Sequence, residues 1–489
     1  MSLAAVARVP VPRHSTNPWV VLTLVCLAQF MVVLDATVVN VALPSIQADL
    51  HMSDDDLQWV VNAYTLVFGG FLLLGGRAGD LIGRKRVFLA GVAIFTGASL
   101  LDGLAQSSEW LIIARGIQGL GGALVSPAAL SIVNTTFETE EERTKALGVW
   151  SAIAAGGGAV GLIVGGVLTD FLSWPWIFFV NIPIGIATFV LSARLVPESK
   201  DEEIHKGFDI AGAATVTAGL IALVYAIVRT NTVGWVSVET LGIGGLAVVL
   251  LVLFVRIEKR SAEPLVRLDI FKVRTLRTAN IVLFLIVSGL YAMFFFNSLY
   301  VQRVLGYSPL QAGLAFLPFT AGIVIGAGLA QQLAPRIGLR SSALIGMVIA
   351  VAGMFWLLRL EPSGSYVTDL LPSIVPVSVG MGLAFVPLTL IATGGLPAAD
   401  AGLASGLYNT SQQIGGALGL AVLSTLAANR TDAALADGVA KAHALVDGYV
   451  AAFAGAAVLV ALGALLLFLL LRPRDLETIK TDQPVTVPG

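Results

Sequence analysis

Two charged residues lie in stretches that are otherwise apolar enough to cross a membrane. Asp35 is near the middle of QFMVVLDATVVNVALP (29–44), and Arg115 lies in LIIARGIQGLGGALVSPA (111–128). An ionised side chain in hydrocarbon is costly, so such residues mark functional sites by default. Burial favours the protonated form of an acid, and a nearby cation favours the ionised form. A conformational change that alters the burial of the acid or its distance from the cation can therefore make the acid bind or release a proton. We therefore predict that Asp35 is a shared proton and substrate site, tuned by Arg115.

Structural roles are the alternatives for both charges. Asp35 could be a buried acid that is permanently paired to hold the fold together. Asp102 and Arg115 lie on opposite sides of a short turn at Ser107–Ser108, so Arg115 could simply pair with Asp102 across a helical hairpin. The sequence leaves these alternatives open.

The depth of each charge along its helix is consistent with contact between Asp35 and Arg115. Asp35 lies about 24 Å from Trp19 along the first apolar run, at ~1.5 Å per residue, and the depth of Arg115 agrees to within roughly two helical turns. One face of the first helix, which does not include Asp35, carries Gln29, Ala36 and Asn40. Polar groups on two faces predict a neighbouring helix on one side and a cavity on the other.

The composition is that of a protein with many membrane spans. The chain has 489 residues, of which 56% are hydrophobic and only 12% charged, whereas soluble domains have about 25% charged residues. A net charge of −2 predicts no nucleic-acid partner. The single cysteine, Cys26, allows no intramolecular disulfide, and the four histidines are scattered, so no metal and no cofactor are expected.

Two further classes of feature are not expected. The apolar run from Trp19 to Leu43 is longer than the apolar part of a signal peptide, so we expect no cleaved signal. The sequence has no catalytic triad and no phosphate-binding loop, so we expect no enzyme.

The apolar runs predict an all-α polytopic membrane protein. About 20 apolar residues cross a bilayer as a helix, and the sequence predicts fourteen such spans. They are 19–43, 57–75, 87–105, 110–133, 146–168, 175–195, 208–228, 236–255, 279–301, 308–331, 341–358, 370–393, 404–428 and 449–471.

The basic residues predict the orientation of these spans. With a cytoplasmic N-terminus, few of the 29 Lys and Arg residues fall in segments outside the cell, namely Arg229, Arg303, Arg359, Arg430 and Lys441. Loops rich in Lys and Arg face the cytoplasm. Both termini are therefore predicted to be cytoplasmic, and the acidic loop DLHMSDDD (49–56) is predicted to lie outside.

The chain also shows signs of internal duplication. The sequence APRIGLR (334–340) is similar to GDLIGRK (79–85) at the corresponding place in the other half. The predicted parts are a six-helix bundle (1–195), two extra helices with a basic linker (196–277), and a second six-helix bundle with a short tail (278–489). Two similar halves around a central site are typical of transporters, because one half can rock against the other.

The most specific motif lies between the second and third spans, in GGRAGDLIGRKRVF (75–88). An acid at the end of one helix and bases at the start of the next both oppose the helix dipole, so other groups must compensate these charges. A turn made tight by glycines would let Asp80 face Arg84. Alternatively, the basic residues only set the membrane topology.

This stretch resembles the loop 2–3 motif of the major facilitator superfamily, G-x-x-x-D-r-x-G-r-k. The matching residues are Gly76, Asp80, Gly83, Arg84 and Lys85, while Leu81 replaces the usual base. The resemblance implies a cytoplasmic latch between the two halves in the outward-facing state.

Further motifs resemble the fourteen-helix drug:H⁺ antiporter branch of that superfamily. The stretch around Arg115 is similar to the span-4 motif R-x-x-q-G, which is linked to proton transfer in the family. GGGAVGLIVGG (156–166) is similar to the antiporter motif G-P-x-x-G-G, with Leu162 in place of proline. Glycines every four residues allow close helix contact, which is the alternative explanation of this stripe. Gly157, Gly161 and Gly165 lie at this spacing, and Gly161, Gly165 and Gly166 match the motif. The same branch is indicated by LDATVVNVALPSI (34–46), PWIFFVNIPIG (175–185) and SGLYNTSQQIGGALG (405–419).

The resemblance implies a major facilitator fold, with two six-helix bundles and two extra central helices. It also implies a proton-coupled antiporter that exports drugs, antibiotics or other amphipathic or cationic small molecules across the cytoplasmic membrane by alternating access. The expected partners are a small-molecule substrate, protons and membrane lipid, and the protein is expected to be a monomer. The alternatives are an exporter of one endogenous metabolite or self-made antibiotic, and a membrane receptor that transports nothing.

The ninth span supplies the predicted substrate wall, in LYAMFFFNSLYVQ (290–302). Aromatic faces and amide groups suit apolar or cationic ligands. The candidates are Phe295, Asn297, Tyr300 and Gln302. Packing against protein or lipid is the alternative role for each of them.

Overall fold

The protein is all helical wherever its structure is described. The structure is a computed structural model that describes residues 17–137, 139–199, 209–261, 264–394 and 401–476, and regular secondary structure in these ranges is helical throughout. Within them, 12 helices are long and apolar enough to cross a membrane. The predicted spans 146–168 and 404–428 fall in helices α5 and α15, which are not among the 12. The count of fourteen spans therefore stays a prediction.

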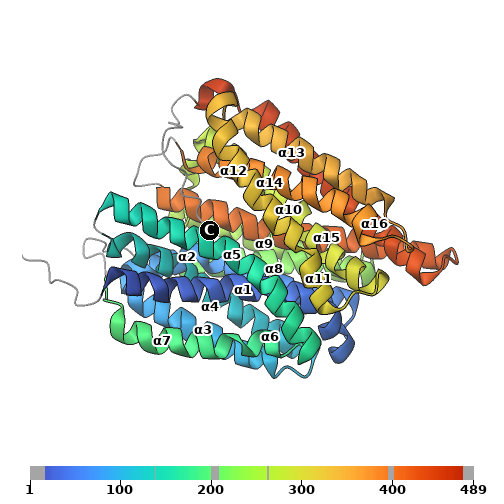
Figure 1. Cartoon of the computed structure of the whole chain (residues 1–489), viewed down its shortest axis with the longest axis horizontal. Coiled ribbons are helices and arrows are strands. Elements are labelled where there is room, and N and C mark those ends of the chain that lie inside the picture. The colour runs from blue at the N-terminus through green and yellow to red at the C-terminus, as the bar shows by residue number, and fades with distance from the viewer. Residues whose placement is uncertain (1–16, 138, 200–208, 262–263, 395–400, 477–489) are drawn as a thin grey trace, which may run out of the picture.

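The first half of the molecule contains α1 to α7 and forms the lower part of Figure 1. Its helices are α1 (Pro18–Leu50), α2 (Asp54–Ile82), α3 (Arg84–Gly103), α4 (Ser108–Thr136), α5 (Glu140–Phe171), α6 (Trp176–Phe179) and α7 (Asn181–Leu195). Ser53 and Ser107 are the N-caps of α2 and α4, and their side chains accept hydrogen bonds from the first turns. The predicted span 175–195 is divided at Val180. Pro183 accounts for the break, since its ring clashes with the carbonyl group four residues earlier.

The second half contains α10 to α16 and forms the upper part of Figure 1. Its helices are α10 (Arg274–Leu299), α11 (Pro309–Ala315), α12 (Leu317–Ile337), α13 (Leu339–Trp356), α14 (Leu371–Thr393), α15 (Ala401–Ala436) and α16 (Lys441–Leu470). Short helical turns cover Leu268–Lys272, Tyr300–Val304, Leu357–Arg359, Tyr366–Leu370 and Pro473–Leu476. The predicted span 308–331 is divided at Phe316, two residues before a proline.

The internal duplication is visible in matching turns of the two halves. Gly83 joins α2 to α3 with a φ of +118°, and Gly338 joins α12 to α13 with a φ of +87°. Both values lie in a region of backbone conformation that residues other than glycine rarely adopt. The two motifs that are similar in sequence therefore form turns that are similar in backbone conformation.

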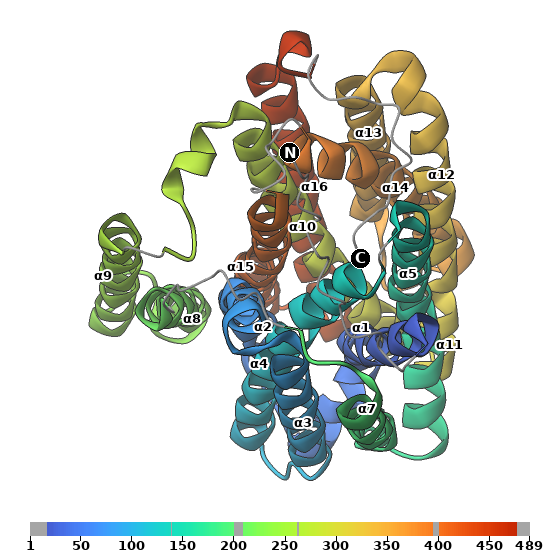
Figure 2. The same ribbon diagram turned by 90° about the vertical axis from the view of Figure 1, so that its left-hand side faces the viewer.

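Helices α8 (Ile210–Val233) and α9 (Val238–Arg260) stand outside the two bundles, as Figure 2 shows. Helix α8 packs against both halves through an apolar cluster that includes Leu66 of α2 and Ala417 of α15. Helix α9 packs on α8 and exposes large apolar side chains such as Val238 and Leu241. Exposed apolar surface of this kind is suited to contact with lipid.

The two ends of the bundle differ in charge and in closure. We call the end with residues 83–86 and 264–274 the basic end, which lies to the left in Figure 1, and the other end, with residues 51–53 and 305–308, the opposite end. The halves are joined at the opposite end. There Ser298 Oγ donates to the carbonyl oxygen of Asn40 (2.6 Å), and Gln302 Nε2 donates to that of Val41 (2.9 Å).

Two polar contacts extend this closure to the surface of the opposite end. Arg303 Nη2 lies 3.0 Å from Asp54 Oδ1 and also donates to Gln47. Ser308 Oγ donates to Asp170 Oδ2 at 2.8 Å. The first contact joins the helical turn Tyr300–Val304, which follows α10, to α1 and α2. The second joins the start of α11 to α5.

Candidate functional site

Asp35 and Arg115 form a buried ion pair inside the first half. Arg115 Nη1 lies 2.6 Å from Asp35 Oδ2, and the two side chains are 2% and 0% exposed. They belong to α1 and α4, two neighbouring helices of the bundle. The similar depths calculated from the sequence thus correspond to a direct contact.

The polar side chains of Gln118 and Asn181 also bond Asp35. Its Oδ1 accepts hydrogen bonds from Gln118 Nε2 (2.8 Å) and Asn181 Nδ2 (3.0 Å). Gln118 also donates to Ser99 Oγ (2.7 Å). The carboxylate is therefore held by one ion pair and two neutral donors, as buried charges require.

Arg115 is held from its other sides by α2 and by aromatic rings. Its Nε donates to the carbonyl oxygen of Val60 (3.0 Å), and its guanidinium carbon lies 4.4 Å from the ring centroid of Tyr64. The ring centroid of Phe178 lies 5.7 Å away. These contacts fix the guanidinium between Asp35 and the centre of the molecule.

Asp102 is buried in the same bundle, but it does not pair with Arg115 in this structure. Among the described residues, neither of its carboxylate oxygens has a hydrogen-bond partner, and the ion pair of Arg115 is with Asp35. The structure thus pairs Arg115 with Asp35, while Asp102 lies near enough to interact with both charges without bonding either side chain.

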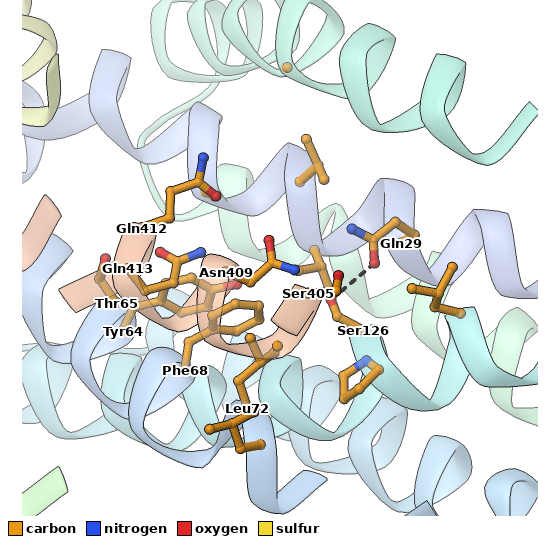
Figure 3. A pocket seen from close by; sticks show the side chains of 18 of the residues that line it. Gln29, Tyr64, Thr65, Phe68, Leu72, Ser126, Ser405, Asn409, Gln412 and Gln413 are labelled. Atoms are coloured by element: carbon orange, nitrogen blue, oxygen red, sulfur yellow. Dashed lines mark hydrogen bonds between the residues drawn. The ribbon is translucent and has the colours of Figure 1, made fainter. Parts of the chain in front are cut away.

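A cavity of about 1210 Å³ lies between the two halves. Gln29, Ala36 and Asn40 line it, as expected for one polar face of α1, and Figure 3 shows part of its wall. Arg115 lines the cavity, but Asp35 does not. Asp35 is therefore placed behind Arg115 as seen from the cavity.

Only one of the four predicted substrate contacts lies on this cavity. Phe295 lines it. Tyr300 donates its hydroxyl hydrogen to the carbonyl oxygen of Glu361 (2.7 Å), and Gln302 bonds Val41 across the closed opposite end. The amide of Asn297 is fully buried and has no hydrogen-bond partner among the described residues. The three residues beyond Phe295 lie farther along α10 and its terminal turn, toward the closed end.

Most of the polar cavity wall was not predicted as such from the sequence. The wall includes Tyr64, Thr65 and Phe68 of α2 and Asn409, Gln412 and Gln413 of α15, which Figure 3 labels. The α15 residues belong to the stretch 405–419, whose amides were a signal for family membership but had been given no role. Aromatic faces beside neutral amides form a surface suited to amphipathic molecules.

The glycine stripe of α5 allows close approach on two sides. A Cβ atom added at Gly161 would meet Leu34 O at 3.1 Å and the hydroxyl of Thr37, and one at Gly165 would lie 2.9 Å from Val38 Cα. Gly157 faces Val33 of α1 in the same way. A Cβ at Gly166 would lie 2.7 Å from Leu310 Cα, in the other half. The stripe packs α5 against α1 and also against α11.

The motif after α2 is bound to the end of α7. Lys85 N donates to Glu198 Oε1 (3.1 Å), Arg84 N donates to the carbonyl oxygen of Ser199 (3.0 Å), and Arg86 Nε lies 3.6 Å from Glu198 Oε2. The side chain of Asp80 lies outside the described part of the structure. Gly76 lines the cavity. These contacts are within the first half, and a latch between the halves stays a prediction.

Gly83→Val tests the role of this turn. The change forces a side chain into a φ of +118°, which costs about 1–3 kcal/mol, and its Cβ would lie 2.6 Å from Glu198 Oε1. We expect slower transport with unchanged affinity for cargo, because Gly83 does not line the cavity. Rates and affinities of efflux measured in vesicles check this. Gly338→Val, at a matching turn with open space around it, is the control for backbone strain alone; a lower affinity in Gly83→Val would contradict the assignment.

No cluster of metal ligands is found in the part of the chain that the structure describes. In the described ranges there is no group of three or more His, Cys, Asp or Glu side chains that could hold a metal ion. The cavity and the adjoining ion pair are the candidate functional site.

Two helical halves that are closed at one end around a central cavity define a membrane transporter. The family model described as Major Facilitator Superfamily matches residues 25–420. The chain therefore belongs to the major facilitator superfamily, and it is a multi-pass protein of the cell membrane with a small-molecule substrate.

Similar proteins of known name include resistance and export proteins. A puromycin resistance protein of Streptomyces alboniger is 41% identical over 467 residues, which is 95% of this chain and 92% of the relative. A cephamycin export protein of Amycolatopsis lactamdurans is 40% identical, with 89% of each chain covered. A multidrug resistance protein of Mycobacterium tuberculosis is 37% identical over 82% of this chain and 74% of the relative.

Solved structures confirm the fold. The chain is similar to a bacterial homologue of the human lysosomal transporter Spinster in an inward-facing, unoccupied conformation, with a TM-score of 0.67 and 17% identity. The match covers 92% of this chain and 96% of that chain. At this identity the likeness concerns the fold alone.

Proposed function

We propose that the protein exports antibiotics or other amphipathic small molecules from the cell, in exchange for protons. The names of relatives that share about two fifths of its residues, a puromycin resistance protein and a cephamycin export protein, support export of this class of cargo. The mixed aromatic and amide wall of the cavity supports it independently. Transport without chemical change of the cargo is part of the proposal.

One observation carries the proton coupling: the buried acid Asp35 is paired with Arg115, and Arg115 lines the cavity. Protonation of Asp35 removes the negative charge that holds the guanidinium. Arg115 then becomes free to repel a cationic cargo or to bind an anionic one. When the guanidinium of Arg115 moves away from Asp35, the carboxyl group of Asp35 more readily keeps its proton. Proton and cargo are thereby made competitors through one side chain.

The direction of transport rests on the distribution of basic residues. We propose that the basic end faces the cytoplasm, in line with the positive-inside rule, and that both termini lie there. The cavity would then face the cytoplasm, since residues near the basic end such as Arg77 and Arg267 line it while polar contacts join the halves at the opposite end. Protons would enter from outside and leave inside as cargo moves out.

The remaining structural assignments belong to the same proposal. We propose fourteen spans, counting α5 and α15, and a working monomer surrounded by lipid. The divisions at 195 and 277 separate the two bundles from α8, α9 and the linker. Alternating access would come from rocking of these bundles about the central cavity.

Export of a single compound is the second candidate for the cargo. The names of two relatives each refer to one class of antibiotic, puromycin and cephamycin, and not to a mixture. A receptor without transport is less consistent with a cavity of about 1210 Å³ between two halves.

Uptake by everted membrane vesicles tests the proposal and separates these candidates. Vesicles energised to an acidic interior should accumulate puromycin, ethidium or both, and dissipation of the pH gradient should release them. Accumulation of several unrelated compounds would support multidrug export, and accumulation of one would support the second candidate. If none of a broad antibiotic panel were accumulated by well-expressed protein, export of this class would be excluded.

A further inference from the structure

Helices α2 and α15 form a long antiparallel contact between the two halves, which we call the α2–α15 seam. Two contacts show its direction. A Cβ added at Gly406 would lie 2.5 Å from Leu73 Cδ2, and one at Gly69 would lie 2.7 Å from Gln413 Cβ. Residue numbers thus rise along α15 as they fall along α2, from the basic end toward the opposite end.

The cavity follows only the first part of this seam. Leu73, Thr65, Gln413 and Leu420 all line it. Extending the register from Gly69 and Gln413 places Asn62 level with Leu420, because both helices rise equally per residue. The cavity wall therefore stops near Asn62, well before the seam does.

Beyond that level, the seam contains polar side chains that have nothing to bond. Gln58 and Asn62 share a helix face with Gly69, which faces α15. Both residues are buried, with 1% or less of their surface exposed. The same register places Ser424 level with Gln58, on the face of Gln413. None of the side-chain N and O atoms of Gln58, Asn62 and Ser424 has a hydrogen-bond partner among the described residues.

Buried amides without partners are rare, and each one requires an explanation. In this closed seam, they are desolvated without compensation, which is unfavourable. The other seam between the halves is built differently. There a Cβ at Gly313 would meet the backbone of Leu162, and Gly166 packs on the backbone of Leu310. Small residues and backbone contacts close the α5–α11 side, whereas neutral hydrogen-bonding groups lie unused on the α2–α15 side.

Helix α8 covers the polar seam from outside, as Figure 2 shows. Leu66 of α2, Val224 of α8 and Ala421 of α15 belong to one buried apolar cluster. Thr425 Oγ1 of α15 also donates to the carbonyl oxygen of Ile227 in α8 (3.4 Å). Lipid cannot reach the seam while α8 is in place, so the seam could take up water without exposing amides to hydrocarbon.

We infer that the α2–α15 seam is the second half of the transport path. Gln58, Asn62 and Ser424 line it when the opposite end opens, and they then bond water and the neutral donor and acceptor groups of the passing cargo. Helix α8 acts as the lateral seal of this path, which gives one of the two extra helices a function. The inference rests on the proposed function, because it assumes that the opposite end opens during export.

Cysteine accessibility tests the inference in intact cells. The native cysteine is replaced by Cys26→Ser, and Gln58→Cys and Asn62→Cys are added singly. A cationic, membrane-impermeant thiosulfonate is the probe. We expect both cysteines to react during active transport, at least about tenfold faster than Leu66→Cys, as for a site that opens in one of two states in exchange. Leu66 is the matched control, since it lies on the same helix, is fully buried, and belongs to the apolar cluster that includes residues of α8.

Gln302→Cys distinguishes failure of this inference from failure of the proposed function. Gln302 bonds the other half across the closed opposite end, so its cysteine must react whenever that end opens. Reaction of Gln302→Cys without reaction of either seam cysteine would overturn the path. Equal reaction of Leu66→Cys would overturn the seal. Absence of reaction at Gln302→Cys would instead contradict alternating access itself.

A double variant provides a second readout that does not depend on labelling within the seam. Gln58→Leu/Asn62→Leu removes the desolvated amides and should stabilise the closed seam. In this background we expect labelling of Gln302→Cys to slow by about tenfold or more, as the open state becomes a minor one. An unchanged labelling rate, in protein present at normal levels, would overturn the role of the amides.

Discussion

Asp35→Asn is expected to abolish proton-driven efflux while the protein stays folded and inserted. The amide keeps the size of the carboxyl group and can still bond Gln118 and Asn181, but it cannot bind and release a proton. Accumulation of the exported drug in everted vesicles, normalised to folded protein, should fall to the level of vesicles without the transporter. Asp35→Glu, which can titrate, should keep part of the activity.

Asp102→Asn is the matched control for this change. Asp102 is also an aspartate, it is fully buried in the same bundle, and it has no hydrogen-bond partner among the described residues. We expect this variant to transport nearly normally, because its amide is not paired with Arg115. Full proton-driven transport by Asp35→Asn would show that another group carries the proton.

Arg115→Ala is expected to reduce stability and to change the pH dependence of exchange. Removal of one partner from a buried ion pair leaves the other charge without compensation, which costs about 3–5 kcal/mol. Asp35 then lacks its charge partner, so the pH dependence of exchange should change. Thermal unfolding of the purified protein and exchange rates across a pH series measure the two effects.

Two double variants separate a coupling role of Arg115 from a structural one. Asp35→Asn/Arg115→Gln removes both charges of the observed pair and should recover stability without recovering proton-driven efflux. Asp102→Asn/Arg115→Gln should not transport against a gradient either, since Asp35 then lacks its cation. Normal efflux by the Asp102 double variant would mean that Arg115 serves only to balance Asp102.

The helices could be predicted well because their signal is local. Each predicted span corresponds to a helix or to a pair of helices, since a run of about 20 apolar residues is a property of the sequence alone. The two divided spans contain Pro183 and Pro318, whose positions were visible but whose breaks were not predicted. Prolines are tolerated inside other helices of this chain, such as Pro44 and Pro127, so proline alone does not decide where a helix ends.

The site could be predicted only in part, because it depends on which helix faces meet. The depth of a residue along its membrane helix can be calculated from the sequence, and similar depths predicted that Asp35 and Arg115 could be in contact. Rotation and pairing of helices are tertiary properties. They decided that Phe295 reaches the cavity and Tyr300 does not, and that amides of α15 face the cavity. The contact of Glu198 with the turn after Gly83 was missed for the same reason, as 113 residues separate Lys85 from it.

The pair formed by Arg303 and Asp54 has a consequence for the energetics of the working cycle. It bridges the halves at the opposite end, and the side chain of Asp54 is 62% exposed. Exposed pairs are weakened by dissolved salt, whose screening length is about 8 Å at physiological ionic strength. Under the proposed alternating access, every turnover must separate this pair, so the electrolyte at that end would affect the balance between the two conformations. We therefore expect rising ionic strength to shorten the time that the protein spends in the conformation described here.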